Sequence, residues 1–292
     1  QGHLETVFRP APPTVDQFGG IPRSGLYTLI QQPFGQDSPL QVNRNFSPDL
    51  LTKVPFFQLA LGLMGLIDRS GGLKATAAAG NLPRKAVREL YDLGWFPNRW
   101  VDEGKRKLNR EDDFSQLFAL RHCLTMAKLI RKSKGKFVLT KTGKQLYEAP
   151  PKHSELFTLL GETYGTRFSL PFFDMYPDEH YGQWGIGFSL LLLKAFGQQT
   201  QSADWYHRHY RPFFVSLMGE PEMRTSSYLD VDPIRESTRM YLVRFLRRYA
   251  ELLGLVTLTE AAPKPKQLFT DPPDISVQAT ELLQTWIGGA LP

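Results

Sequence analysis

The sequence predicts a mainly helical protein of the α+β class with short β-hairpins. Apolar residues recur at helical spacing through most long segments, as in residues 235–253. Short β-branched runs next to Gly or Pro, such as 136–139 and 275–278, are typical of strands. With 292 residues, 41% of them hydrophobic, the chain is long enough for about two domains.

The first part of the chain has a different composition. Residues 1–53 are rich in Pro, Gly, Gln and Asn, so we expect an extended arm that packs along the body of the protein. Residues 25–30 (GLYTLI) predict one strand within this arm. Residues 1–3 are typical of a tag remnant and carry no fold information.

Residues 54–150 change to alternating helix and strand patterns. The predicted order is helix, short strand, helix, helix, hairpin, helix, with bounds 54–67, 71–76, 81–92, 111–128, 129–139 and 142 onwards. The expected helix caps are Asn81, Asp112 or Asp113, and Thr142, which has Gln145 at capping-box spacing. The hairpin turn is expected at 132–135, and residues 93–111 form a long polar loop.

The net positive charge of the chain comes entirely from this middle segment. The whole chain has a formal net charge of +6, whereas residues 54–150 contain 18 Lys/Arg and 9 Asp/Glu, a net charge of +9. No acidic residue occurs from Phe114 to Tyr147, a stretch that holds eight bases. Such a run of one sign favours polyanionic partners, although a solvated surface is the alternative.

The middle segment resembles winged-helix DNA-binding domains. The element order and the ending F137-V-L-T-x-x-G143 carry this resemblance. The motifs L73-K-A-T-x-x-x-G-N-L-P83 and V138-L-T-K-T-G-K144 are also similar to a group of uncharacterised bacterial proteins, some of them plasmid-borne. The loop 93–111 departs from the short turn of a helix-turn-helix, which puts standard docking in the major groove in doubt.

The resemblance implies a DNA-binding surface. The helix 113–128 would be the recognition helix with an exposed polar face, and residues 132–136 the wing. The residues that we assign to this surface are Arg121, His122, Thr125, Lys128, Arg131, Lys132, Lys134, Lys136, Lys141 and Lys144, with Lys105, Arg106 and Lys107 from the loop. Lys and Arg supply phosphate contacts, and helix side chains read base edges.

The rest of the chain predicts a helical connector at 151–199 and a second, degenerate winged-helix-like domain at 200–292. Helices are expected at 154–164, 185–197, 204–218, 235–253 and 280–287, and strands at 254–258 and 275–278. The segment 261–274 stands where a second wing would lie. The arginines of helix 235–253 are interpreted as an exposed stripe. This copy is expected to bind a protein partner or a second copy of the chain.

No pattern supports an enzyme, and we expect no cofactor and no metal. The chain has no HExxH, no GxSxG and no complete phosphate-binding loop. Residues 174–180 (DMYPDEH) combine acids with a histidine but are interpreted as a solvated loop. Cys123 lies in an apolar helical pattern and is expected in the core. No apolar run is long enough to span a membrane.

We therefore expect a non-enzymatic DNA-binding protein of a bacterial cytoplasm, with duplex DNA as the partner. A role in regulation or in a mobile element is what the resemblance implies. The alternative is a winged-helix module that binds an acidic protein, because winged helices also serve protein–protein contacts. A salt-dependent affinity for duplex DNA would distinguish the two.

Overall fold

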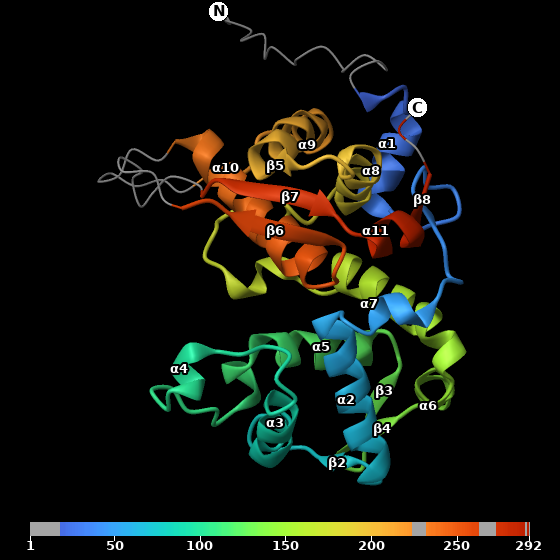
Figure 1. Ribbon diagram of the computed structural model, residues 1–292, viewed down its shortest axis with the longest axis vertical. Helices are drawn as coiled ribbons and strands as arrows, with labels where there is room; N and C mark the ends of the chain where they lie inside the picture. The colour runs from blue at the N-terminus through green and yellow to red at the C-terminus, as the bar shows by residue number, and fades with distance from the viewer. Residues whose placement is uncertain (1–17, 224–231, 263–272, 290, 292) are drawn as a thin grey trace, which may run out of the picture.

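The computed structural model describes residues 18–223, 232–262, 273–289 and 291, and confirms the predicted α+β class (Figure 1). The α-helices are α1 (Arg23–Gln31), α2 (Pro55–Arg69), α3 (Arg84–Tyr91), α4 (Arg99–Asp102), α5 (Ser115–Met126), α6 (Lys141–Glu148), α7 (His153–Thr166), α8 (Ile186–Phe196), α9 (Ala203–Met218), α10 (Pro233–Tyr241) and α11 (Glu281–Trp286). The strands are β1 (Gln41–Val42), β2 (Leu73–Lys74), β3 (Ile130–Ser133), β4 (Lys136–Leu139), β5 (Gln201–Ser202), β6 (Val256–Glu260), β7 (Ile275–Ala279) and β8 (Ile287–Gly288). The 3-10 helices are η2 (Pro48–Leu51), η3 (Glu111–Asp113), η4 (Pro150–Lys152) and η5 (Leu170–Phe173), and the π-helix η6 (Leu242–Glu251) continues α10.

Two three-stranded antiparallel sheets have the same topology. In the N-terminal half, which runs from α2 to α6, the strand order is β2-β4-β3. In the C-terminal half, which runs from η5 to β8, it is β5-β7-β6. In each half a helix precedes the first strand and a short helix follows the hairpin. The first strand and the hairpin are separated by α3, α4, η3 and α5 in one half, and by α9 and α10 with its continuation η6 in the other. The same element order therefore occurs twice along the chain, at opposite ends of the molecule in Figure 1.

The repetition extends to single hydrogen bonds at the end of each hairpin. The N–H of Thr140 donates to the carbonyl of Leu129 at 3.0 Å, and the N–H of Thr280 donates to the carbonyl of Leu255 at 3.0 Å. Each threonine hydroxyl also caps the following helix. The same side-chain type thus closes the hairpin and begins the last helix in both halves.

The backbone before each hairpin repeats as well. Lys128 has φ 59°, and Gly254 has φ 69° at the corresponding place. Glycine adopts this left-handed conformation without a steric penalty, whereas a lysine does so at a cost of roughly 1 kcal/mol. The N-terminal copy therefore has a positively charged lysine at this turn, where the C-terminal copy has an unstrained glycine.

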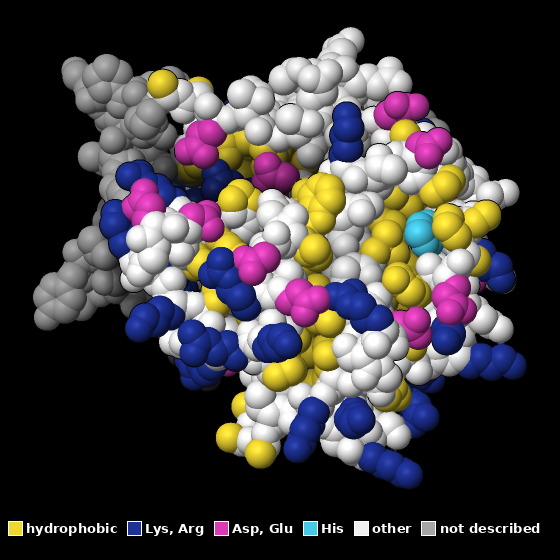
Figure 2. Space-filling model, turned by 60° about the horizontal axis from the view of Figure 1, so that its bottom comes forward, with side chains coloured by type: hydrophobic (Ala, Val, Ile, Leu, Met, Phe, Trp, Pro, Cys, Tyr) yellow, Lys and Arg dark blue, Asp and Glu magenta, His cyan; other side chains and the backbone are white. Residues whose placement is uncertain are grey.

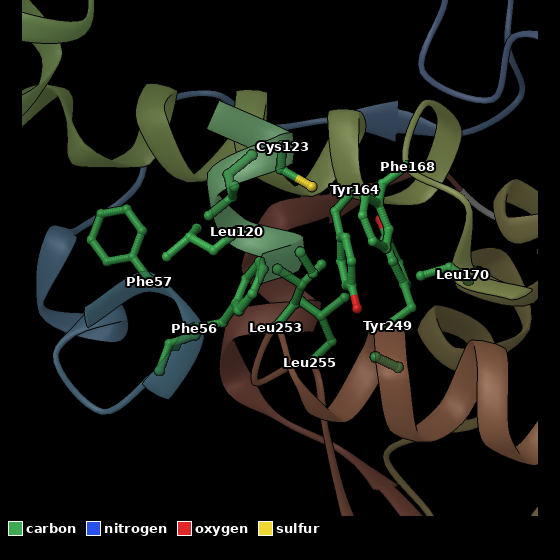
Figure 3. Close-up of a cluster of buried hydrophobic side chains, with 14 of the residues drawn as sticks. Phe56, Phe57, Leu120, Cys123, Tyr164, Phe168, Leu170, Tyr249, Leu253 and Leu255 are labelled. Carbon is green, nitrogen blue, oxygen red and sulfur yellow. The ribbon is translucent and has the colours of Figure 1, made fainter. Parts of the chain in front are cut away.

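One hydrophobic core joins the two halves, with α7 at its centre. Phe56 of α2 packs on Tyr164 of α7 with ring centroids 5.0 Å apart, and Tyr164 stacks on Tyr249 of η6 at 6.1 Å. Leu120 and Cys123 of α5 reach the same cluster (Figure 3). Cys123 is fully buried, as predicted. The segment predicted as a connector therefore lies in the centre of the molecule.

The N-terminal arm belongs to the C-terminal half. Strand β1 pairs with β8 near the end of the chain, and α1 packs on α8. The prediction of a strand at 25–30 is wrong, because this segment lies within α1. Leu26 and Leu29 are buried there, one turn apart, and supply a helical stripe that six residues could not distinguish from a strand. Residues 1–17 lie outside the described residues.

Several helices begin later or earlier than predicted. Pro83, not Asn81, is the N-cap of α3, and Thr140, not Thr142, is the N-cap of α6. Asp113 accepts hydrogen bonds from the backbone of Asn109 and from that of the residue after it, so it closes the loop rather than capping α5. The loop itself contains α4 and η3. These shifts leave the element order unchanged.

Two predictions of exposure in the C-terminal half are wrong. Arg244 is fully buried rather than part of an exposed stripe, and it forms a bidentate ion pair with Asp174 at 2.8 and 3.0 Å. Arg248 also contacts Asp174 at 2.7 Å. Asp178 is buried and accepts the N–H of Tyr181 at 2.6 Å. Within the segment 174–180, the carboxylates of Asp174 and Asp178 are therefore drawn into the protein, and Asp174 neutralises the arginines of η6, whereas Met175 and Glu179 remain exposed. The predicted second wing falls mostly outside the described residues.

The shared core predicts that both halves unfold in a single transition. Tyr164→Ala removes a fully buried ring between α2 and η6, so we expect the free energy of unfolding to fall by about 3–5 kcal/mol. Urea unfolding followed by circular dichroism and by tryptophan fluorescence should give coincident curves. Met175→Ala, at an 86% exposed side chain, is the control and should change stability by less than about 0.5 kcal/mol. Two separate transitions would contradict a common core.

A buried histidine predicts loss of stability in acid. The imidazole of His207 lies between the Tyr181 hydroxyl at 2.8 Å and the Thr238 hydroxyl at 3.1 Å, and burial lowers its pKa to about 4. In the unfolded chain this imidazole takes up a proton near pH 6.5, so its contribution to the free energy of unfolding is fully present above that pH. It decreases as the pH falls towards 4, by up to about 3 kcal/mol. His207→Gln should flatten this slope in urea titrations, whereas the exposed His209→Gln should leave it unchanged.

Candidate nucleic-acid interface

The basic hairpin is closed by a turn of two residues. The last cross-strand pair is Ser133 with Lys136, so the turn consists of Lys134 and Gly135 rather than the four residues predicted. Lys134 has φ 47° and Gly135 has φ 74°. Two positive φ angles are the signature of a type I′ turn, whose twist matches that of the strands. The turn places Lys134 at the outermost point of the hairpin.

The outer face of the sheet brings together bases that are distant in the sequence. Lys74 of β2 lies directly opposite Lys136 of β4. Arg131 of β3 lies opposite Val138, on the same face as Lys136 because side chains alternate along β4. Like charges directly opposite each other destabilise a sheet. A bound anion would relieve this repulsion.

Two further bases come from the start of α3. Arg84 and Lys85 are exposed in its first turn. The ammonium group of Lys132 reaches the turn before α3, where a Cβ added to Gly80 would lie 2.8 Å from Nζ. We call the combined set the hairpin surface. It consists of Lys74, Arg84, Lys85, Arg131, Lys132, Lys134 and Lys136.

All members of the hairpin surface are exposed, and none forms an ion pair with an acid of the described residues. Figure 1 places β2, the hairpin and α3 at one end of the molecule. Figure 2, turned so that this end comes forward, shows Lys and Arg side chains along its lower part. The uncompensated charge is therefore concentrated at one end of the N-terminal half.

The other predicted bases lie apart or are neutralised. Lys128 and Lys141 are exposed, whereas Lys144 lies 3.4 Å from both Asp68 and Glu148, which raise its pKa. In the loop, Lys105 pairs with Glu103 at 2.5 Å, Arg106 lies 3.9 Å from Asp113, and Lys107 is exposed. In Figure 1 this loop lies on the far side of α3 from the hairpin, so it does not extend the hairpin surface.

The predicted recognition helix does not present an exposed polar face. Arg121 is buried, and its Nε donates to Glu111 at 2.5 Å. Phe118 stacks on Phe172 of the C-terminal half with centroids 5.4 Å apart and 9° between the planes. His122 is half-buried beside Arg121, and burial lowers its pKa to about 4. Arg121 is not exposed as predicted, because its guanidinium group is held by Glu111 and lies 5.2 Å from the ring centroid of Phe137.

Exposure along α5 is greatest at its C-terminal end. Thr125 is exposed in the last turn and Lys128 two residues beyond the helix, whereas Gln116 and His122 are half-buried. The hydroxyl of Thr125 donates to the carbonyl of Arg121 within the helix at 2.8 Å. Glu111, whose other oxygen accepts the N–H of Leu82 at 2.7 Å, fixes α5 to the segment before α3. The helix is therefore a structural element with two exposed polar residues at its end.

The sequence-based assignment did not include Lys74, Arg84 and Lys85. They precede the acid-free run from Phe114 to Tyr147, which supplied most of the assigned residues. The strand order β2-β4-β3 places Lys74 next to the hairpin, and the approach of the Lys132 ammonium group to Gly80 brings the start of α3 near it. The predicted short strand at 71–76 was the available signal, because in the winged-helix order that strand pairs with the hairpin.

Within the described residues, no three or more His, Cys, Asp and Glu side chains are arranged to hold a metal ion. None of the helices described is both long and apolar enough to cross a membrane.

The comparisons with known proteins concern only part of the chain. Residues 52–152 match the model of a family described as the Y4jL N-terminal domain. This segment contains α2 to α6 with the basic hairpin, and it is similar to that family. No curated protein and no solved structure matches the chain.

The same substitution at two arginines should change stability by very different amounts, because one arginine is buried and the other is exposed. Arg121→Met leaves Glu111 buried without its cation and should lower the free energy of unfolding by about 3–5 kcal/mol. Arg131→Met removes an exposed base and should change stability by less than about 0.5 kcal/mol. Thermal and urea unfolding of the two variants measure this difference. Equal effects would mean that Arg121 is not held as a buried ion pair.

Proposed function

We propose that this protein binds duplex DNA without chemical conversion, through the hairpin surface. The proposal rests on the exposed bases of β2, β3, β4, the hairpin turn and α3, none of which is paired with an acid of the described residues. A concentration of unpaired Lys and Arg is what phosphate contacts require, and releasing counterions from DNA supplies most of the affinity.

The position of α5 sets the proposed mode of binding. Because Arg121 is buried and Phe118 is covered by Phe172, few side chains of this helix are available to base edges. Lys134 at the tip of the hairpin and Lys74 beside Lys136 would instead follow the phosphate backbone. Contacts of this kind position a protein but carry little sequence information, so shape rather than base readout would dominate.

The proposal includes a winged-helix character for both halves. The order helix, strand, helix, helix, hairpin, helix and the shared strand order support it. The basic surplus belongs to the N-terminal copy, so that copy would bind DNA and the C-terminal copy would contact a protein or a second copy of the chain. A bacterial cytoplasm is the proposed location.

Salt titration of DNA binding tests the proposal. Lys132→Glu/Lys134→Glu/Lys136→Glu should weaken binding to a labelled random-sequence duplex. It should also reduce the slope of log affinity against log salt by roughly 2.7, because three phosphate contacts are lost. Fluorescence anisotropy over a range of salt concentrations measures both quantities.

A matched charge reversal is the control. Arg23→Glu/Lys53→Glu/Arg167→Glu changes the net charge equally at exposed positions away from the hairpin. This control should retain most of the slope. If the wild type does not bind, or both triple variants lose equal slope, the hairpin surface is not a DNA site. Binding of an acidic protein that depends on the same lysines would then support the alternative partner.

A further inference from the structure

A cleft of about 750 Å³ opens between the two halves, away from the hairpin surface. Its lower wall is the loop 93–111 with the start of α5, and its upper wall is η6. Tyr164 of α7 and Phe173 of η5 form part of the floor. The volume is in the range of small-molecule sites, which often lie where two structural units meet.

The long loop that departs from a helix-turn-helix is built to form this wall. The hydroxyl of Tyr91 donates to Asp102 at 2.7 Å and accepts the N–H of Asn98 at 2.8 Å. Val101 and Leu108 are buried beneath the loop. Ordering a long loop costs conformational entropy, which these contacts offset. The result is a fixed wall that holds Trp95 at the cleft.

Aromatic rings form part of the inner surface of the cleft, beside charged side chains. Trp95 and Phe96 are half-buried in the loop, and Phe96 contacts Phe114 edge-on with centroids 6.1 Å apart. Tyr164 and Phe173 face them from the C-terminal side. Aromatic faces carry partial negative charge and attract organic cations, most strongly when the cation is shielded from water.

The ion pairs at the cleft leave negative charge uncompensated. Arg248 is held by Asp174 at 2.7 Å and by two backbone carbonyls, and Arg247 is held by Glu260 at 2.7 Å. Glu251 also lines the cleft and forms no ion pair with a described residue. Among the described residues, Asp112 accepts a hydrogen bond from the side-chain amide of Asn81 at 3.2 Å. The cations of the upper wall are thus neutralised, and Arg106 of the lower wall lies 3.9 Å from Asp113. The carboxylates of Glu251 and Asp112 remain without an ion pair among the described residues.

We propose that this cleft is a binding site for a small organic cation with an aromatic ring. The ring would stack with Trp95 and Phe96, and the cationic group would face Glu251 and Asp112. The binding requires no covalent step. Because the walls come from both halves, a bound cation would contact the N-terminal and the C-terminal half together. The site is separate from the hairpin surface and does not depend on DNA binding.

A pair of probes with the same ring and opposite charge tests this proposal. Benzyltrimethylammonium should bind the intact protein with one site per chain in isothermal titration calorimetry. Glu251→Gln should weaken this binding about tenfold or more, and Trp95→Ala should weaken it by a similar factor. Phenylacetate should show no saturable binding.

The control variant is Glu281→Gln, an exposed carboxylate at the start of α11. It should bind benzyltrimethylammonium as the wild type does. Glu251→Gln changes an exposed side chain, so this variant should fold as the wild type does. Circular dichroism checks the fold of both variants, and Glu251→Gln still tests the proposal if Trp95→Ala is destabilised. Absence of saturable binding, affinity unchanged in Glu251→Gln, or tighter binding of phenylacetate would overturn the proposal.

Discussion

The burial of α5 on two sides is the constraint on which the rest of the structure depends. Leu117, Leu120 and Leu124 pack into the N-terminal core, whereas Phe118 contacts Phe172 of the C-terminal half. A helix that is apolar over much of its circumference cannot leave either side in water. The two halves are therefore held together. Arg121, on the same helix, is removed from solvent, and its charge has to be balanced by Glu111.

The two halves share an element order and one core, but they differ in how their charged side chains are placed. Thr140 and Thr280 close equivalent hairpins and cap equivalent helices, so the backbone scheme is shared. The charge is not shared, because residues 54–150 carry 18 bases and 9 acids while the rest of the chain has a small acidic excess. In the C-terminal half, arginines such as Arg244 are used internally, against Asp174. Bases in the N-terminal sheet are left to solvent, where a polyanion would meet them.

Local patterns predicted the elements well and side-chain environments poorly. Helical spacing located α2, α5 and α7 to α9, and the Lys-Gly pair with flanking strands located the hairpin, because these signals are contained in a few neighbouring residues. The segment 25–30 was too short to separate helix from strand. Arg244 was interpreted as exposed because its partner is 70 residues away in the chain. Lys74 joined the candidate site only through strand pairing. Long-range pairing of charges is set by the fold, so the pattern of one segment does not contain it.

The packing that buries most of α5 also separates the two proposed sites. The hairpin surface uses only elements of the N-terminal half, so phosphate contacts there need no movement of α7 or η6. The cleft, in contrast, has walls from both halves, which the shared core around Tyr164 holds together. With base readout by α5 limited to its exposed end at Thr125 and Lys128, the contribution of the N-terminal half to recognition would come from charge and shape.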